Sequence, residues 1–230
     1  MQQALFAFCM ILLTVISFLV MTRLYNRFSF SFFIPVLTAT TLIIILLVIL
    51  HIPYESYMKG GQWINSLLGP AVVALAYPLY KQRRFLMTHL FTILGGVLIG
   101  ATSGMVSVTI LAKLFGINHP LILSIIPKSL TTPVAIEVAK GLGGDASMAV
   151  IGVMIAGIFG VVTAPMIFKL TRVNSSIGRG VALGSASHAI GTSKAGEYGE
   201  LAFSMSSVTM TLCAIIGSLL GPFIVWLFHI

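Results

Sequence analysis

Two observations predict that this sequence forms an all-α polytopic membrane protein with about six to eight transmembrane segments. Of its 230 residues, 58% are hydrophobic and only 8% are charged, whereas a soluble globular domain carries about 25% charged residues. The apolar residues also form runs long enough to cross the roughly 30 Å hydrocarbon core of a bilayer. No Ser/Pro-rich linker or charge block divides the chain, so residues 1–230 are expected to form a single transmembrane domain.

The first apolar run, residues 3–22, is expected to remain in the protein as a transmembrane helix. A signal peptide carries positive charge before its apolar region and a small-residue cleavage site after it. Here nothing basic precedes the run, while Arg23 and Arg27 follow it. The N-terminus is therefore expected on the outer side of the membrane.

Basic residues lie mainly between the later apolar runs. These runs cover residues 34–50, 64–80, 85–115, 146–170 and 201–228, and the net charge is +8. The positive-inside rule explains this pattern as cytoplasmic loops, so a nucleic-acid partner is not expected. If residues 119–141 crossed the membrane completely, the basic loop 169–179 would lie outside. The rule therefore favours a re-entrant or broken-helix hairpin for 119–141.

Segments 119–141 and 176–196 are less hydrophobic and rich in Gly, Pro, Ser and Thr. Non-helical backbone at membrane depth is tolerated only where protein buries it or water lines it. Both segments are therefore expected to be interrupted and to face an internal cavity.

Short similarities suggest an inverted repeat with halves 1–82 and 85–230. IPVLTATT (34–41) resembles IPKSLTTP (126–133), and LLGPAVVALAYP (67–78) resembles ALGSASHAIGTS (182–193). Paired interruptions in two halves are typical of inverted-repeat transporters. Chance similarity between two stretches rich in Thr and Pro is the alternative.

The first candidate site surrounds Lys128, at a position that otherwise reads as embedded in the membrane. Ionisable groups at that depth usually face a cavity or pair with one another. Lys128 would attract a carboxylate, with added donors from a helix N-terminus near Pro133. A structural Lys128–Glu137 ion pair is the alternative. The candidate residues of this stretch are Lys128, Ser129, Thr131, Thr132 and Glu137.

The second candidate site is the small-residue stretch 184–195. His188 could bind a substrate or carry a proton near neutral pH, or could simply hydrogen-bond to a neighbouring helix. Ser187 and Thr192 add hydroxyl groups, and Lys194 is interpreted as a positioning or entry charge.

No feature of the sequence predicts an enzyme, a cofactor or a metal site. Cys9 and Cys213 both lie in apolar segments without metal-ligand spacing. No nucleophile elbow, phosphate loop or zinc pattern is present in the sequence.

Three motifs resemble the LrgB/CidB family of bacterial membrane proteins. They are YMKGGQWIN (57–65), IIPKSLTTPVAIEVAKGLGG (125–144) and ALGSASHAIGTSKA (182–195), and the similarity runs over essentially the whole chain. The family is related to the membrane half of the plastid glycolate/glycerate transporter.

The resemblance implies a multi-pass protein of the bacterial plasma membrane and two competing functions. One is transport of small monocarboxylates such as pyruvate or glycolate. The other is a holin- or antiholin-like role that modulates murein hydrolase activity and cell lysis. It also implies a smaller LrgA/CidA-type membrane partner. The embedded polar residues favour the carrier, while proton coupling and homo-oligomerisation are left open.

Overall fold

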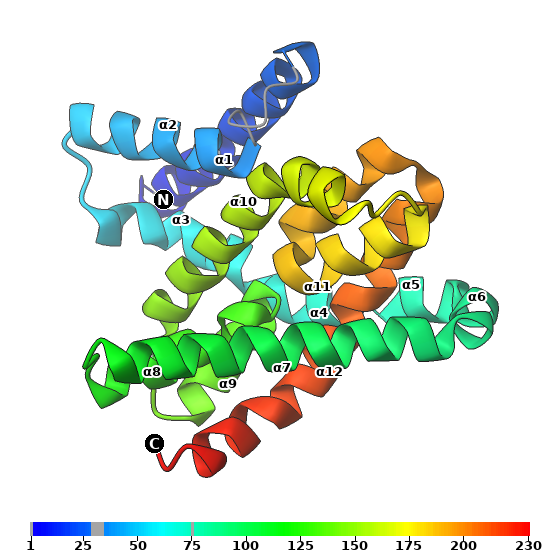
Figure 1. The fold of residues 1–230 in the computed structure, drawn as a ribbon. Coiled ribbons are helices and arrows are strands. Elements are labelled where there is room, and N and C mark those ends of the chain that lie inside the picture. Colours follow the sequence, from blue (N-terminus) through cyan, green and yellow to red (C-terminus); the bar gives the residue numbers. More distant parts are fainter. Residues whose placement is uncertain (1, 29–34, 75) are drawn as a thin grey trace. The chain divides into compact units, whose positions relative to one another are not determined.

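The computed structural model describes residues 2–28, 35–74 and 76–230, and every regular element in them is a helix (Figure 1). The predicted all-α class is thereby confirmed. These residues form two compact units, Met1–Ala71 and Val72–Ile230. Part of the predicted loop 23–33 and the first residue of the run 34–50 lie outside the described residues.

The N-terminal unit contains α1 (Gln2–Phe28), α2 (Pro35–Ile49) and α3 (Tyr54–Ser66). α1 packs against both α2 and α3. Gly60 of α3 allows close approach, since an added Cβ would lie 2.8 Å from the Met10 Cβ of α1. The Thr14 and Tyr57 hydroxyls are 2.9 Å apart across the same interface.

The apolar run 64–80 is not one transmembrane helix. Leu67 separates the end of α3 from α4 (Leu68–Ala74), and the described part of the run continues in α5 (Ala76–Lys81). Pro70 has no N–H to donate to the Ser66 carbonyl, which explains why α3 ends at Ser66. An interruption of this run, as predicted, lies at Leu67.

The C-terminal unit continues through α6 (Arg83–Thr88) to three long helices. These are α7 (Leu90–Leu114), α10 (Ala146–Thr171) and α12 (Glu200–Leu227). Together with Ala4–Arg27 of α1, they are the helices of the described residues long and apolar enough to cross a membrane, and α2 is a shorter apolar helix. The multi-pass character predicted from composition is therefore supported, and the described residues contain four long candidate spans.

α7 and α12 pack against each other and run in the same general direction, crossing obliquely in Figure 1. Just before α7, the Gln82 amide donates to the Ser204 hydroxyl at 3.2 Å, near the start of α12. At the other end, the Lys113 ammonium donates to the Phe228 carbonyl at 2.6 Å. The two C-terminal ends therefore lie at the same end of the unit.

The segment between α7 and α10 folds into a helix–break–helix hairpin. It consists of α8 (His119–Ile125), the 3₁₀ turn η2 (Ile126–Ser129) and α9 (Thr132–Gly141), and is named hairpin 1. Pro133 cannot donate to the Ser129 carbonyl, which favours a break at this position, although Pro165 and Pro222 lie inside the continuous helices α10 and α12. The Asp145 N–H donates to the Ser124 hydroxyl at 2.7 Å, which ties the end of hairpin 1 back to α8. The predicted break in 119–141 is confirmed.

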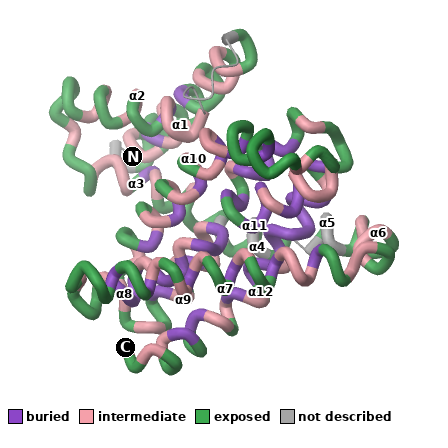
Figure 2. Tube along the Cα trace, in the orientation of Figure 1, coloured by how far each residue is buried: buried purple, intermediate pink, exposed green. Residues whose placement is uncertain are grey.

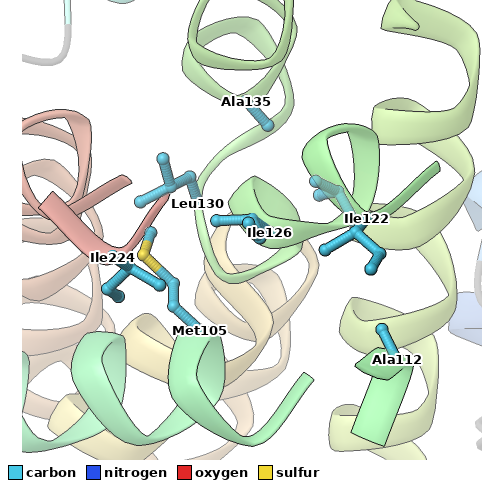
Figure 3. Close-up of a cluster of buried hydrophobic side chains, with 8 residues drawn as sticks. Met105, Ala112, Ile122, Ile126, Leu130, Ala135 and Ile224 are labelled. Carbon is cyan, nitrogen blue, oxygen red and sulfur yellow. The ribbon is translucent and has the colours of Figure 1, made fainter. Parts of the chain in front are cut away.

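Apolar side chains bury the turn of hairpin 1 against α7 and α12. Ile126 and Leu130 are fully buried and contact a cluster that includes Met105 of α7 and Ile224 of α12 (Figure 3). Figure 2 shows that buried segments are concentrated around this turn and along α11 and α12. The break is therefore covered by protein, as non-helical backbone in a membrane requires.

α11 (Ser176–Ala195) forms a second hairpin, because its helix reverses at one residue. His188 has φ 49° and ψ −123°, and beyond it the chain returns so that Gly191 packs on the carbonyl of Leu183. This segment, followed by η3 (Gly196–Tyr198), is named hairpin 2. The interruption was predicted, but its position at His188 was not.

The predicted similarity of residues 34–41 to 126–133 has no structural counterpart in the described residues. Residues 35–41 form the regular first turns of α2, whereas 126–133 hold the break of hairpin 1. Hairpin 1 and hairpin 2 each follow a long helix.

Gly144→Ala is expected to destabilise the protein, because the end of hairpin 1 lies against backbone. An added Cβ would lie 2.7 Å from the Ser124 nitrogen, and backbone cannot move aside as a flexible side chain can. Overpacking of this kind costs about 1–3 kcal/mol, so the thermal midpoint in detergent should fall. Gly141→Ala is the matched control, since nothing lies within 4 Å of its added Cβ. Equal midpoints for the two variants would contradict this packing.

Candidate functional site

The breaks of the two hairpins meet near the middle of α7. A Cβ on Gly104 would lie 3.1 Å from the Ser129 Cβ of hairpin 1, and a Cβ on Gly100 would lie 3.1 Å from the Ser185 Cβ of hairpin 2. Gly100 and Gly104 are one turn apart, about 6 Å along the helix axis. Residues 129 and 185, far apart in the sequence, therefore approach the same part of one long helix.

Glycines of α10 also allow the breaks to approach closely. A Cβ on Gly152 would lie 3.3 Å from the Lys128 Cβ, and one on Gly160 would meet the Ser187 hydroxyl oxygen. Small residues serve this purpose at helix contacts in membranes. α10 thus packs against Lys128 of hairpin 1 and Ser187 of hairpin 2.

Lys128 is a half-buried cation beside the break of hairpin 1. Its ammonium donates to the Ser129 hydroxyl at 3.2 Å. Among the described residues, no carboxylate pairs with it. The predicted alternative of a Lys128–Glu137 ion pair is therefore wrong.

The break of hairpin 2 holds buried polar atoms without protein partners. His188 is only 1% exposed. Within the described residues, neither its Nδ1 nor its Nε2 has a hydrogen-bond partner, and the same is true of the Ser187 Oγ. Buried polar groups in folded proteins are nearly always hydrogen-bonded. Unpartnered donors and acceptors at this break are therefore a strong indication of a binding site.

Thr209 of α12 is a further polar residue at the same level. Gly180 packs against Ala202 and Gly184 against Ser206, so the next turn of each segment brings His188 to the level of Met210, the residue after Thr209. The Thr209 hydroxyl is buried and has no partner among the described residues. It can therefore contribute to the same polar region.

Thr192, a predicted site residue, connects hairpin 2 to α12. Its hydroxyl donates to the His188 carbonyl at 2.8 Å and lies 2.9 Å from the Ser206 hydroxyl. The sequence analysis did not identify the buried polar residues of α12, which are Ser206, Ser207, Thr209 and Thr211. The run SMSSVTMT (204–211), in an otherwise apolar span, was the signal that could have found them.

The N-terminus of α9 also lies at the break of hairpin 1. Thr131 is the buried N-cap residue, and its side chain makes no capping hydrogen bond. The first i to i−4 hydrogen bond of α9 is donated by the Ala135 N–H to the Thr131 carbonyl at 2.9 Å. The earlier N–H groups of a helix lack intrahelical acceptors and favour an anion. Thr132, half-buried in the first turn, adds a hydroxyl.

Two predicted site residues lie apart from this region. The Glu137 side chain is 74% exposed and accepts from Lys140 at 3.2 Å. Lys194 is buried near the end of hairpin 2 and pairs with Glu197 at 2.6 Å. The structure therefore places Lys128, Ser129 and Thr131 at the break of hairpin 1 and Ser187, His188 and Thr192 at the break of hairpin 2, whereas Glu137 and Lys194 lie apart from both.

This arrangement suits a small anion better than a metal ion. It combines one cation without a carboxylate partner, several hydroxyls, an imidazole and a helix N-terminus. In the described part of the chain, no group of three His, Cys, Asp or Glu side chains could hold a metal.

Comparison with known proteins places the chain in a family. Residues 14–227 match the model of the LrgB-like family. The chain is 63% identical over the full length of both proteins to the uncharacterized protein YxaC of Bacillus subtilis (strain 168). It is 40% identical to the holin-like protein CidB of Staphylococcus aureus, over 97% of each chain. Its identity to the CidB of Staphylococcus epidermidis is 37%, over the full length of both.

No solved structure matches the chain. The family match covers most of the sequence, and the relatives align over nearly their whole length. The chain belongs to the LrgB-like family of membrane proteins.

Proposed function

We propose that the protein is a carrier of small monocarboxylates of the pyruvate and glycolate class in the bacterial plasma membrane. One observation carries the proposal: buried polar atoms without partners lie where two helix breaks meet beside Lys128, a cation with no carboxylate partner among the described residues. A bound carboxylate would accept hydrogen bonds from these buried atoms and would also balance the positive charge of Lys128. Ion pairs of this kind are strong because donor and acceptor are both charged.

The direction of the helices supports two hairpins that enter the membrane from opposite sides. Hairpin 1 follows the C-terminal end of α7, whereas hairpin 2 begins where Val181 lies against Gly96, near the N-terminal end of α7. Neither hairpin crosses fully in this arrangement, so α7 with hairpin 1 and α10 with hairpin 2 form an inverted repeat. Substrate sites of inverted-repeat carriers lie at such helix breaks near the membrane midplane.

The distribution of charge supports an orientation. Lys81, Arg83 and Arg84 precede α7, and Lys169 and Arg172 lie at the end of α10. Both groups fall at the hairpin 2 end of the unit, which the positive-inside rule places in the cytoplasm. Hairpin 1 would then open toward the outside.

His188 is the candidate for proton coupling. An imidazole can change its charge near neutral pH, and no described atom hydrogen-bonds to either nitrogen of this ring. A bound carboxylate would offset the added positive charge of a protonated ring. Anion and proton would then be carried together.

A holin-like role is the second candidate, supported by the name of the CidB relatives, holin-like proteins. A lesion-forming protein needs oligomerising helices but no selective site. In either role, a smaller LrgA/CidA-type membrane protein is the proposed partner, and homo-oligomers are compatible with the small-residue helix faces.

Uptake into liposomes distinguishes the two functions. We expect the purified full-length protein to give saturable uptake of radiolabelled pyruvate or glycolate, without leakage of a neutral dye of similar size. The assay is run with the protein alone and with its small partner. Saturation is expected because a carrier has a limited number of sites.

Dye leakage equal to carboxylate flux would overturn the carrier proposal and favour the holin-like role. An excess of unlabelled pyruvate provides the control, since it should compete for a carrier but not for a lesion.

A further inference from the structure

A basic pocket lies at the cytoplasmic end proposed for α10, separate from the hairpin breaks. It has a volume of about 260 Å³. Lys169 comes from the last turns of α10, Asn174 from the following loop, and Arg179 and Tyr198 from the two ends of hairpin 2. The remaining lining residues are Pro165 and Phe168.

Arg179 holds the two ends of hairpin 2 against α10. Its guanidinium donates through Nε to the Val173 carbonyl at 3.0 Å and through Nη2 to the Asn174 side-chain oxygen at 3.4 Å. It also lies 4.9 Å from the centre of the Tyr198 ring. Because a guanidinium has five N–H donors, others remain for a ligand.

The charge around this pocket favours an anion. Between Asp145 and Glu197 the sequence has no acidic residue, and Glu197 is paired with Lys194. Lys169 also lines the pocket, and its side chain has no hydrogen bond or ion pair within the described part of the chain. Two cationic side chains thus face one small space.

The surface beside the pocket is apolar and belongs to a candidate membrane span. Met166, Ile167 and Leu170 of α10 are exposed large hydrophobic residues next to Pro165 and Lys169. An acyl chain can lie along this face, while a headgroup reaches the pocket at the end of the span. A soluble anion would make no use of the apolar face.

We infer that the pocket binds the phosphate group of an anionic membrane phospholipid, such as phosphatidylglycerol. Lys169 and Arg179 bind the phosphate oxygens, Asn174 adds a polar contact, and the acyl chains follow α10. Basic pockets on the cytoplasmic side of membrane helices bind lipid headgroups through this combination of charge and apolar surface. The bound lipid connects α10 to both ends of hairpin 2 and therefore stabilises the base of that hairpin.

The test measures the thermal midpoint of the full-length protein in neutral detergent during lipid titration. Phosphatidylglycerol is expected to raise the midpoint saturably, because it binds the folded protein. Phosphatidylcholine with the same acyl chains, and glycerol phosphate without chains, should have little effect. Lys169→Gln should weaken the apparent affinity about fivefold, since one cation near the membrane surface contributes about that much.

Lys140→Gln is the matched control, because Lys140 is an exposed lysine of hairpin 1 outside this pocket. Lys169→Gln leaves the contacts of Arg179 intact, so its effect does not depend on misfolding of hairpin 2. An equal response to both lipids, an equal response to glycerol phosphate, or unchanged affinity in Lys169→Gln would each overturn the inference. Uptake activity is not used as a readout, so the result is independent of the proposed transport function.

Discussion

Replacing Lys128 by alanine is expected to abolish most saturable carboxylate uptake while the protein still inserts and folds. The substitution removes the cation but keeps the Cβ that packs against Gly152. A hydrogen bond to a charged group contributes about 1.5–3 kcal/mol. Loss of that energy weakens carboxylate binding by about tenfold to more than a hundredfold. Uptake into liposomes at matched protein density measures the effect.

Two further variants make the Lys128 result specific. Lys128→Arg keeps the charge but changes its shape and hydration, so uptake should recover only in part. Lys140→Ala removes an exposed lysine of the same hairpin and should leave uptake unchanged. Full uptake by Lys128→Ala at normal membrane abundance would remove Lys128 from the binding site.

His188→Gly is expected to raise the thermal midpoint and to abolish the pH dependence of uptake. The backbone of His188 has φ 49°, a region that L side chains rarely adopt and that glycine occupies freely. A non-glycine residue in such a conformation costs about 1–3 kcal/mol. The change also removes two buried ring nitrogens that lack partners in the described structure. A more stable protein with impaired transport would show that the strain at His188 is retained for function.

His188→Gln separates the two effects in the same assays. Glutamine keeps a hydrogen-bonding side chain and the strained backbone, but it cannot carry a proton near neutral pH. Its thermal midpoint should therefore not rise as in His188→Gly, while its uptake should lose pH dependence. A lower midpoint for His188→Gly, or unchanged rate and pH dependence for His188→Gln, would identify His188 as a structural residue.

The buried hydroxyls of α12 illustrate a limit of sequence reasoning. Serine and threonine are common in membrane helices, where their hydroxyls often bond to the preceding turn, as Thr211 does to the Ser207 carbonyl at 2.9 Å. Thr209 differs because its buried hydroxyl finds no such acceptor among the described residues. Its sequence neighbours do not distinguish it from Thr211. Only the packing of α12 against hairpin 2 does so.

The sequence by itself determined the features that depend on local physical chemistry. The scarcity of charge predicted a protein surrounded by lipid, and the Pro- and Gly-rich segment 119–141 predicted a break, because a proline cannot donate to the carbonyl four residues before it. The break between Ser129 and Pro133 follows from that rule. The polar residues around Lys128 and His188 were likewise visible, because polar groups are costly in an apolar segment.

Only the tertiary structure decided which of these polar residues share one site. The exposed Glu137 lies on the outer face of α9, whereas Ser129 lies against Gly104, although both belong to hairpin 1. The two breaks meet because α7 and α12 run in the same general direction and because glycines of α7 and α10 allow both hairpins to approach closely. These are contacts between residues far apart in the chain, which hydropathy and local spacing do not encode.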